Sequence, residues 1–119
     1  MKRYVLAVDL KDDPKAIGAY ETHHRAVWPE VVRSLRAVGV RQMDIYRLNR
    51  RLVMVLETED DFDLRRSFAE HVASDPRCAE WEALMQTFQQ PPPGANPGDW
   101  WTLMDPIFQL QDQPASRSR

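Results

Sequence analysis

Three side chains near residue 24 combine a titratable ring with two larger aromatic rings. Tyr20, His24 and Trp28 are spaced four residues apart, so on a helix they lie along one face. An imidazole titrates at about pH 6.5, and partial burial beside a phenol and an indole suits it to proton transfer. The alternative is a histidine at the edge of the core, satisfied by a backbone carbonyl, and spacing alone favours that interpretation.

Trp81 and Glu82 form a second pair of candidate site residues. An indole that lines a cavity is a platform for the apolar face of a sugar ring, and a carboxylate binds hydroxyl groups. Trp81 also fits an apolar helical stripe with Cys78 and Met85, so the pattern alone favours plain packing. We expect Cys78 to be an inert buried thiol. Trp100 and Trp101 alternate if they lie on a strand, in which case at most one faces the interior.

Metal, nucleotide and acyl-transfer chemistry find no support in the sequence. His23 points to a neighbouring helix face and is predicted to be solvated, and no HExxH spacing exists. The single cysteine, Cys78, excludes an internal disulfide and a cysteine-based zinc cage. GxGxxG, P-loop and GxSxG motifs are absent as well. We therefore expect a domain that needs neither a metal nor a disulfide.

Alternating strand and helix patterns must position these residues. The predicted elements are, in chain order, a strand over 3–10, a helical stripe over 14–38, strands over 40–48 and 51–58, helices over 61–73 and 76–89, a loop over 90–98 and a strand over 100–110. Pro29 predicts a kink or restart near Trp28. Gly39 ends the stripe, and Asn49 occupies the hairpin turn.

The order β-α-β-β-α-β is the ferredoxin-like α+β arrangement, an antiparallel sheet with helices on one face. One domain is predicted over residues 1–110, and a disordered tail over residues 111–119. Residues 52–56 form a continuous apolar run, so both faces of that strand must be covered. The same sheet face of a second chain is the economical cover, which predicts a homodimer that closes a dimeric α+β barrel.

Length and charge narrow the class of protein further. A chain of 119 residues accommodates one core. The formal net charge is −2, whereas nucleic-acid and anionic-membrane binders usually carry a basic excess. No apolar run approaches the roughly 18 residues of a membrane span, and the apolar stretch near Met1 is too short for a signal peptide. We therefore expect a cytoplasmic protein with neither nucleic acid nor membrane as a partner.

One family combines these features. The residues on which the resemblance rests are Tyr20-x-x-x-His24-x-x-x-Trp28-Pro29-Glu30 after the first strand, then Gly39, Ile45-Tyr46, and Trp81 with Leu84-Met85. This pattern resembles the L-rhamnose mutarotase family over roughly residues 2 to 110. The resemblance implies a ferredoxin-like fold that dimerises through its sheets. It also implies an enzyme that interconverts the α and β anomers of a 6-deoxy-hexose without a cofactor.

Position by position, the resemblance implies roles for five residues. His24 falls on the catalytic proton donor, Tyr20 on a sugar-contacting tyrosine, and Trp81 on the first of two consecutive pocket tryptophans. Glu82 stands where many members have the second tryptophan, and Met43 where they have another substrate-contacting tyrosine. The catalytic residues therefore match the family, whereas two of the residues that would contact the sugar differ from it. L-fucose and L-rhamnose therefore both remain open as substrates.

Two other classes of function remain open because one scaffold hosts many functions. The first is a cofactor-free or haem-using oxygenase on the same dimeric α+β scaffold, which a haem Soret band would favour. The second is a non-catalytic sugar-binding module that keeps the pocket but not the chemistry. Sugar binding without faster anomer exchange would select that module.

Overall fold

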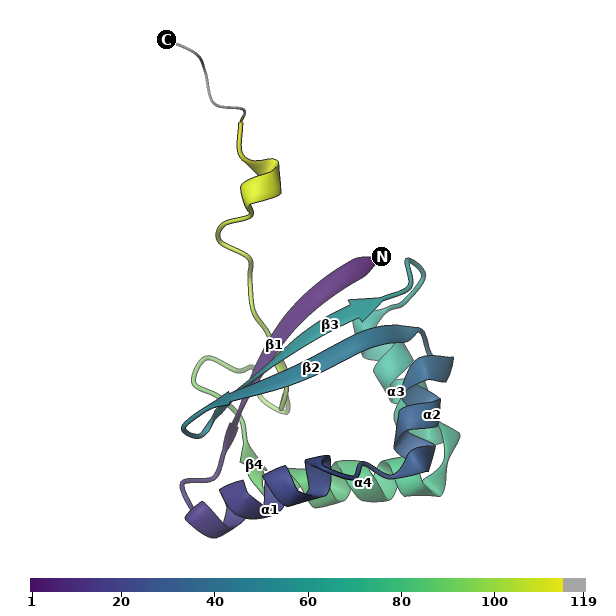
Figure 1. The fold of residues 1–119 in the computed structure, drawn as a ribbon, viewed down its shortest axis with the longest axis vertical. Helices are drawn as coiled ribbons and strands as arrows, with labels where there is room; N and C mark the ends of the chain where they lie inside the picture. Colours follow the sequence, from purple (N-terminus) through teal and green to yellow (C-terminus); the bar gives the residue numbers. More distant parts are fainter. Residues whose placement is uncertain (115–119) are drawn as a thin grey trace.

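The computed structural model describes residues 1–114 and follows the predicted order of elements (Figure 1). The elements are β1 (Lys2–Leu10), α1 (Pro14–His24), α2 (Pro29–Ala37), β2 (Val40–Leu48), β3 (Arg51–Thr58), α3 (Leu64–Ser74), α4 (Pro76–Gln86), β4 (Gln89–Gln90), β5 (Thr102–Leu103) and a 3-10 turn at Leu110–Asp112. The strand order is β2-β3-β1-β4, and β5 also pairs with β1. All pairings are antiparallel and the helices cover one face, which confirms the ferredoxin-like α+β prediction.

Local chemistry sets most of these boundaries. The Asp13 and Asp75 side chains cap α1 and α4 by accepting hydrogen bonds from backbone N–H groups two residues on, at 3.0 and 2.8 Å. Gly39 has φ +109°, which lets the chain turn sharply from α2 into β2. Asn49 has φ 55° in the hairpin between β2 and β3. The turns at Gly39 and Asn49 confirm the predictions made for those two residues.

Pro29 divides the predicted stripe into two helices. It has no backbone N–H to continue a helix but suits a first helical position, so α1 ends at His24 and α2 begins at Pro29. Trp28 is the residue just before α2. It therefore does not share a helix with Tyr20 and His24, and the prediction of one common helical face is wrong for Trp28.

The core lies between the inner face of the sheet and the helices. One cluster comprises Val8, Leu10, Tyr20, Val31, Leu52, Cys78, Trp81 and Met85. The other comprises Leu6, Val40, Met54, Leu56 and Phe62. The inward side chains of β3 link the two clusters, because Leu52 belongs to one and Met54 and Leu56 to the other.

The outer face of the sheet also carries apolar side chains on β3. Val53 and Val55 are only half-buried and alternate with the inward residues of β3. The four α-helices, α1 to α4, all lie on the opposite face of the sheet (Figure 1). Strand β3 therefore carries apolar side chains on both faces, as predicted. In the single chain, the outer face is not covered by any of these helices.

The C-terminal part of the sheet differs from the prediction. Only Thr102–Leu103 forms a strand, and the predicted strand over 100–110 is wrong in length. Beyond the bond from Met104 N to Val5 O, at 2.8 Å, the chain leaves β1. Pro106 lacks the N–H that would continue the ladder, and Ile107 is 99% exposed. In Figure 1 this C-terminal segment extends away from the body.

Two helix boundaries and one strand also differ. Helix α3 begins at Leu64 rather than at residue 61, because the Asp63 side chain caps it by accepting from Arg66 N at 2.8 Å. Helix α4 ends at Gln86 rather than at residue 89. The chain then forms the unpredicted strand β4, which pairs with residues 9–10 of β1. Of the predicted tail, residues 115–119 lie outside the described part of the chain.

Candidate active site

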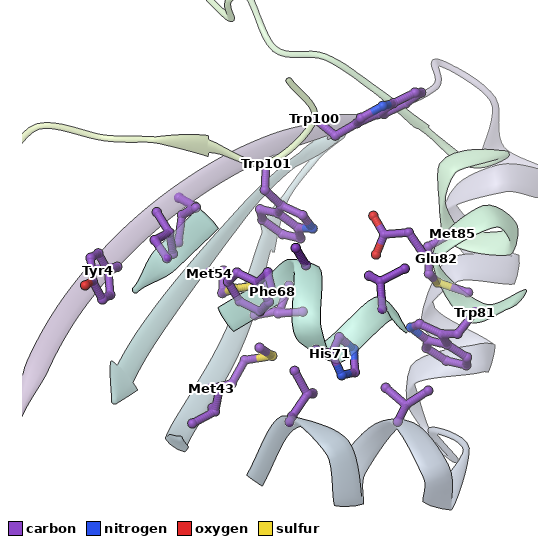
Figure 2. A pocket seen from close by; sticks show the side chains of 18 of the residues that line it. Tyr4, Met43, Met54, Phe68, His71, Trp81, Glu82, Met85, Trp100 and Trp101 are labelled. Atoms are coloured by element: carbon purple, nitrogen blue, oxygen red, sulfur yellow. The ribbon is translucent and has the colours of Figure 1, made fainter. Parts of the chain in front are cut away.

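A cavity of about 1690 Å³ opens between the inner face of the sheet and the helices (Figure 2). All five residues predicted from the sequence line it: Tyr20, His24, Met43, Trp81 and Glu82. They come from α1, β2 and α4, which are far apart in the chain. The fold therefore brings together the complete set of predicted site residues.

His24 is a half-buried base at the C-terminal end of α1. Its Nδ1 lies 2.9 Å from the Tyr20 carbonyl oxygen. A carbonyl only accepts, so Nδ1 carries the hydrogen and the neutral ring keeps its lone pair on Nε2. Burial lowers the pKa of His24, although the bond to the Tyr20 carbonyl opposes the shift. The imidazole is therefore neutral at pH 7, with Nε2 able to accept a proton.

Tyr20 supports His24 and offers a hydroxyl group. The two rings stack with centroids 4.2 Å apart and an interplanar angle of 26°. The Tyr20 hydroxyl accepts a hydrogen bond from Gln89 Nε2 at 3.4 Å. Burial raises the pKa of Tyr20 to about 12, so the hydroxyl keeps its proton and is able to donate it in a hydrogen bond.

Trp81 packs edge-on against the residues around His24. Its ring centroid lies 5.4 Å from that of His24 and 5.1 Å from that of Trp28. His23 also contacts Trp81, with centroids 6.2 Å apart, and contacts Phe88 at 5.8 Å. His23 is thus half-buried, so it is only partly solvated and also packs against aromatic rings, which the prediction of a solvated side chain did not include. The reason is that α4 and the residues after it pack against the last turn of α1.

Glu82 is the acidic residue of this end of the cavity. Its Oε1 accepts a hydrogen bond from Gln86 Nε2 at 3.1 Å. Among residues 1–114, no cation lies within ion-pair distance of its carboxylate. Burial raises the pKa of Glu82, against the opposing effect of the Gln86 bond. Figure 2 shows the carboxyl group pointing into the cavity.

The opposite wall is mostly apolar. Met43 and Ile45 are half-buried on β2 and pack against the second core cluster. Trp100 and Trp101 both line the cavity, but only Trp101 points into it, in agreement with the prediction that at most one faces inward. Neither lies in a strand, and the alternation rule therefore does not apply to them. Figure 2 shows Trp101 pointing inward and Trp100 at the edge of the cavity.

Sequence reasoning missed His71, which is only 6% exposed and also lines the cavity. Its Nδ1 lies 2.8 Å from Ser34 Oγ, and burial lowers its pKa. The signal was present, because Leu64, Phe68 and His71 stand at positions i, i+4 and i+7 of α3. A histidine in an apolar stripe at this spacing is expected to face the core.

Membrane-spanning helices and metal-binding clusters are both absent from the described residues. No helix within residues 1–114 is long and apolar enough to cross a membrane. In the same part of the chain, no group of three or more histidine, cysteine, aspartate or glutamate side chains is placed to hold a metal ion.

A neutral imidazole, a protonated phenol and a carboxyl group share one aromatic cavity on a ferredoxin-like sheet. Together they define an α+β protein equipped for acid–base chemistry on a small ligand. The chain belongs to the L-rhamnose mutarotase family, whose profile matches residues 3–110.

Two relatives match almost the whole chain. An L-fucose mutarotase from Xanthomonas campestris pv. campestris is 42% identical over 114 residues, which cover 94% of this chain and 90% of that protein. A UPF0734 protein of Dictyostelium discoideum is 36% identical over 112 residues, covering 92% and 90% of the two chains.

Solved structures share the fold at lower identity. The crystal structure of an L-rhamnose mutarotase from Formosa agariphila superposes with a TM-score of 0.66 at 20% identity, covering 92% of this chain and 99% of that chain. Tetracenomycin F2 cyclase from Streptomyces glaucescens superposes with a TM-score of 0.50 at 18% identity, covering 100% and 95%. At these identities the likeness concerns the fold alone.

Proposed function

We propose that the protein is an aldose 1-epimerase, or mutarotase, that interconverts the α and β anomers of a 6-deoxy-L-hexose. L-fucose and L-rhamnose are the two candidate substrates. Family membership and the 42% identical L-fucose mutarotase support this proposal. The observation that carries it is His24, which lines the cavity and whose Nδ1 is held by the Tyr20 carbonyl, so that the lone pair of the neutral ring is on Nε2.

The reaction requires little machinery. Ring opening needs a proton on the ring oxygen while the anomeric hydroxyl loses its proton. The free aldehyde then rotates about C1–C2 and the ring recloses on the other face. His24 exchanges a proton with the sugar through Nε2, and Tyr20 holds the imidazole by ring stacking and by its carbonyl.

The remaining predicted residues form the substrate wall. Trp81 supports His24 from the side and offers part of its indole to the sugar ring. Met43 supplies an apolar surface that suits the C6 methyl group of a 6-deoxy sugar. Glu82 faces the cavity from α4, where its carboxyl group is in reach of sugar hydroxyls. In this proposal, no cofactor takes part.

The test is anomer exchange measured by magnetisation-transfer NMR. The protein is added to equilibrated L-fucose, L-rhamnose and D-galactose, and the α-to-β exchange rate of each is compared with the spontaneous rate. We expect acceleration of at least one 6-deoxy-L-hexose, and the faster of the two identifies the preferred substrate. Spontaneous rates for all three sugars would refute the mutarotase proposal.

We also propose that the protein is a homodimer through the outer face of its sheet. Val53, Val55 and the 62% exposed Tyr46 lie on that face. Beyond β5, Phe108 and Leu110 are 64% and 73% exposed on the segment that extends from the body. Burying these apolar groups favours association with a second copy, which presents the same surfaces.

Sedimentation velocity at micromolar concentration tests this assembly. A dimer is expected for the wild-type chain, and a monomer for Val53→Glu, which places a charge on the outer face. A wild-type monomer would refute the proposed dimer.

The cytoplasm is the proposed compartment, where the free buried thiol of Cys78 stays reduced.

A further inference from the structure

Mutarotation needs two proton transfers, and His24 supplies one site for them. Two other titratable groups of the cavity are poorly suited to the second transfer. The Tyr20 hydroxyl is a weak acid, because burial raises its pKa to about 12. His71 is bound to Ser34 on α2, at the end of the cavity formed by α2 and α3. Three carboxyl groups line the cavity. Asp63 caps α3 by accepting from Arg66 N, and Asp99 lies in the loop before Trp100. Glu82 follows Trp81 on α4 and points its carboxyl group into the cavity.

We propose that Glu82 is the second proton-transfer group, giving a proton to the sugar ring oxygen while His24 accepts the anomeric hydroxyl proton. This inference rests on the proposed mutarotase function. It assigns Glu82 a part in the bond-breaking step, whereas the sequence indicated only sugar binding for this position.

The position of Glu82 relative to His24 supports the assignment. Glu82 follows Trp81 on α4, and the Trp81 ring lies 5.4 Å from the His24 ring. Tyr20, which stacks on His24, is close enough to Glu82 for the negative charge to contribute to its raised pKa. The carboxyl group and the imidazole therefore flank one end of the same cavity.

The surroundings of the carboxyl group suit a proton donor. Gln86 donates to Oε1 at 3.1 Å and orients the group. Glu82 Oε2 has no hydrogen-bond partner among residues 1–114. Because no side-chain oxygen there is both fully buried and without a partner, Oε2 must be accessible. Burial favours the neutral acid and raises the pKa of Glu82 toward neutral pH, so that the protonated form is more readily available.

The step balances as follows. The C1–O5 bond breaks, its electron pair goes to O5, and O5 takes the proton of Glu82. His24 Nε2 takes the proton of the anomeric hydroxyl as C1 becomes an aldehyde carbonyl. The site then holds a Glu82 carboxylate and a His24 imidazolium. After rotation about C1–C2, reclosure returns the O5 proton to Glu82 and the imidazolium proton to the anomeric oxygen.

The decisive variant is Glu82→Gln, which keeps the size and polarity of the side chain but has no proton to give. We expect its saturated exchange rate on L-fucose or L-rhamnose to fall about 10²-fold or more. Its Kd for the sugar, followed by tryptophan fluorescence, should stay within about threefold of the wild-type value. Glu82→Asp keeps a carboxyl group and should recover part of the rate.

Glu80→Gln is the matched control, because Glu80 is on the same helix but is exposed and paired with Arg77 at 2.9 Å. It should leave the rate and the melting temperature unchanged. A Glu82→Gln chain that weakens binding without lowering the saturated rate would make Glu82 a hydroxyl-binding residue only and overturn the inference. An active wild type with an equally active Glu82→Gln overturns this inference alone, whereas an inactive wild type overturns the proposed function as well.

Discussion

Two histidines line the same cavity from different helices, the half-buried His24 at the α1 end and the buried His71 at the α3 end. Burial lowers the pKa of both, so both rings are neutral at pH 7. They differ in what surrounds the ring. His24 lies among aromatic rings and shares its end of the cavity with Glu82, whereas His71 lies among hydroxyl groups.

The hydrogen bonds around His71 form a closed set. Ser34 Oγ lies 2.8 Å from His71 Nδ1 and 2.7 Å from Ser74 Oγ. Ser74 Oγ in turn donates to the His71 carbonyl at 2.7 Å. These bonds tie α2 to the last turn of α3, which is a structural role. Burial and a lowered pKa alone therefore do not mark a catalytic histidine. A second proton-transfer group at the same end of the cavity does.

The largest expected difference between the two ends of the cavity is in the effect of a substitution on the rate of anomer exchange. Replacing His24 by Gln removes the basic nitrogen while keeping a polar side chain. We expect the anomer-exchange rate to fall about 10²–10⁴-fold, the usual contribution of a positioned acid or base. Magnetisation-transfer NMR on the faster 6-deoxy-L-hexose measures the change. An unchanged rate would remove His24 from the chemistry and erase the distinction between the two ends.

Replacing His71 by Ala is expected to act on stability instead. The change removes a buried ring and its bond to Ser34, which should cost about 2–4 kcal/mol of unfolding free energy. Urea unfolding measures the cost, and the exchange rate of the folded variant should remain within about threefold of wild type. If the rate of folded His71→Ala dropped as far as that of His24→Gln, both ends would take part in catalysis.

Much of the fold was predictable because local signals agreed with the hydrophobic pattern. Asp13, Asp75 and Gly39 set helix ends by hydrogen bonding and backbone freedom, which are properties of a few consecutive residues. The C-terminal strands were not predictable in the same way. Whether Gln89 or Leu103 pairs with β1 depends on the edge that β1 leaves available, and that is a long-range property.

Spacing alone predicted only the part of the site that one helix carries, and the residues on β2 and α4 followed from the family resemblance. Tyr20 and His24 are four residues apart on α1, so their stacking followed from spacing. The contacts of His23 with Trp81 and Phe88 depend on how α4 packs against α1, which no local pattern shows. The same holds for Gln89, whose bond to the Tyr20 hydroxyl spans 69 residues of sequence.

A smaller effect should follow from removing one hydroxyl group of the His71 network. Ser74→Ala removes the hydroxyl that donates to the His71 carbonyl and contacts Ser34 Oγ, but leaves the contact between His71 and Ser34. The expected cost is about 1–2 kcal/mol, the net value of two such hydrogen bonds. Urea unfolding should show this loss, and the exchange rate should not change. A cost equal to that of His71→Ala would mean that the network acts as one unit.

The smallest expected effect is on the pH dependence of stability, and both histidines should contribute to it. Each has a folded-state pKa below about 6.5, the unfolded value, so the unfolded chain binds protons first as the pH falls. The stabilisation by each neutral ring is therefore complete above about pH 6.5 and is lost as the pH falls toward the folded-state pKa. Glu82, with its raised pKa, acts in the opposite direction.

The unfolding free energy of wild type, His24→Gln and His71→Asn, measured between pH 7.5 and 5, tests this. The Glu82 contribution is common to all three chains and cancels in the differences between them. Both variants should show a flatter decline than wild type, because each lacks one group that binds protons on unfolding. A flatter decline in only one variant would show that the other ring is already solvated, and the two ends would then differ in burial as well as in chemistry.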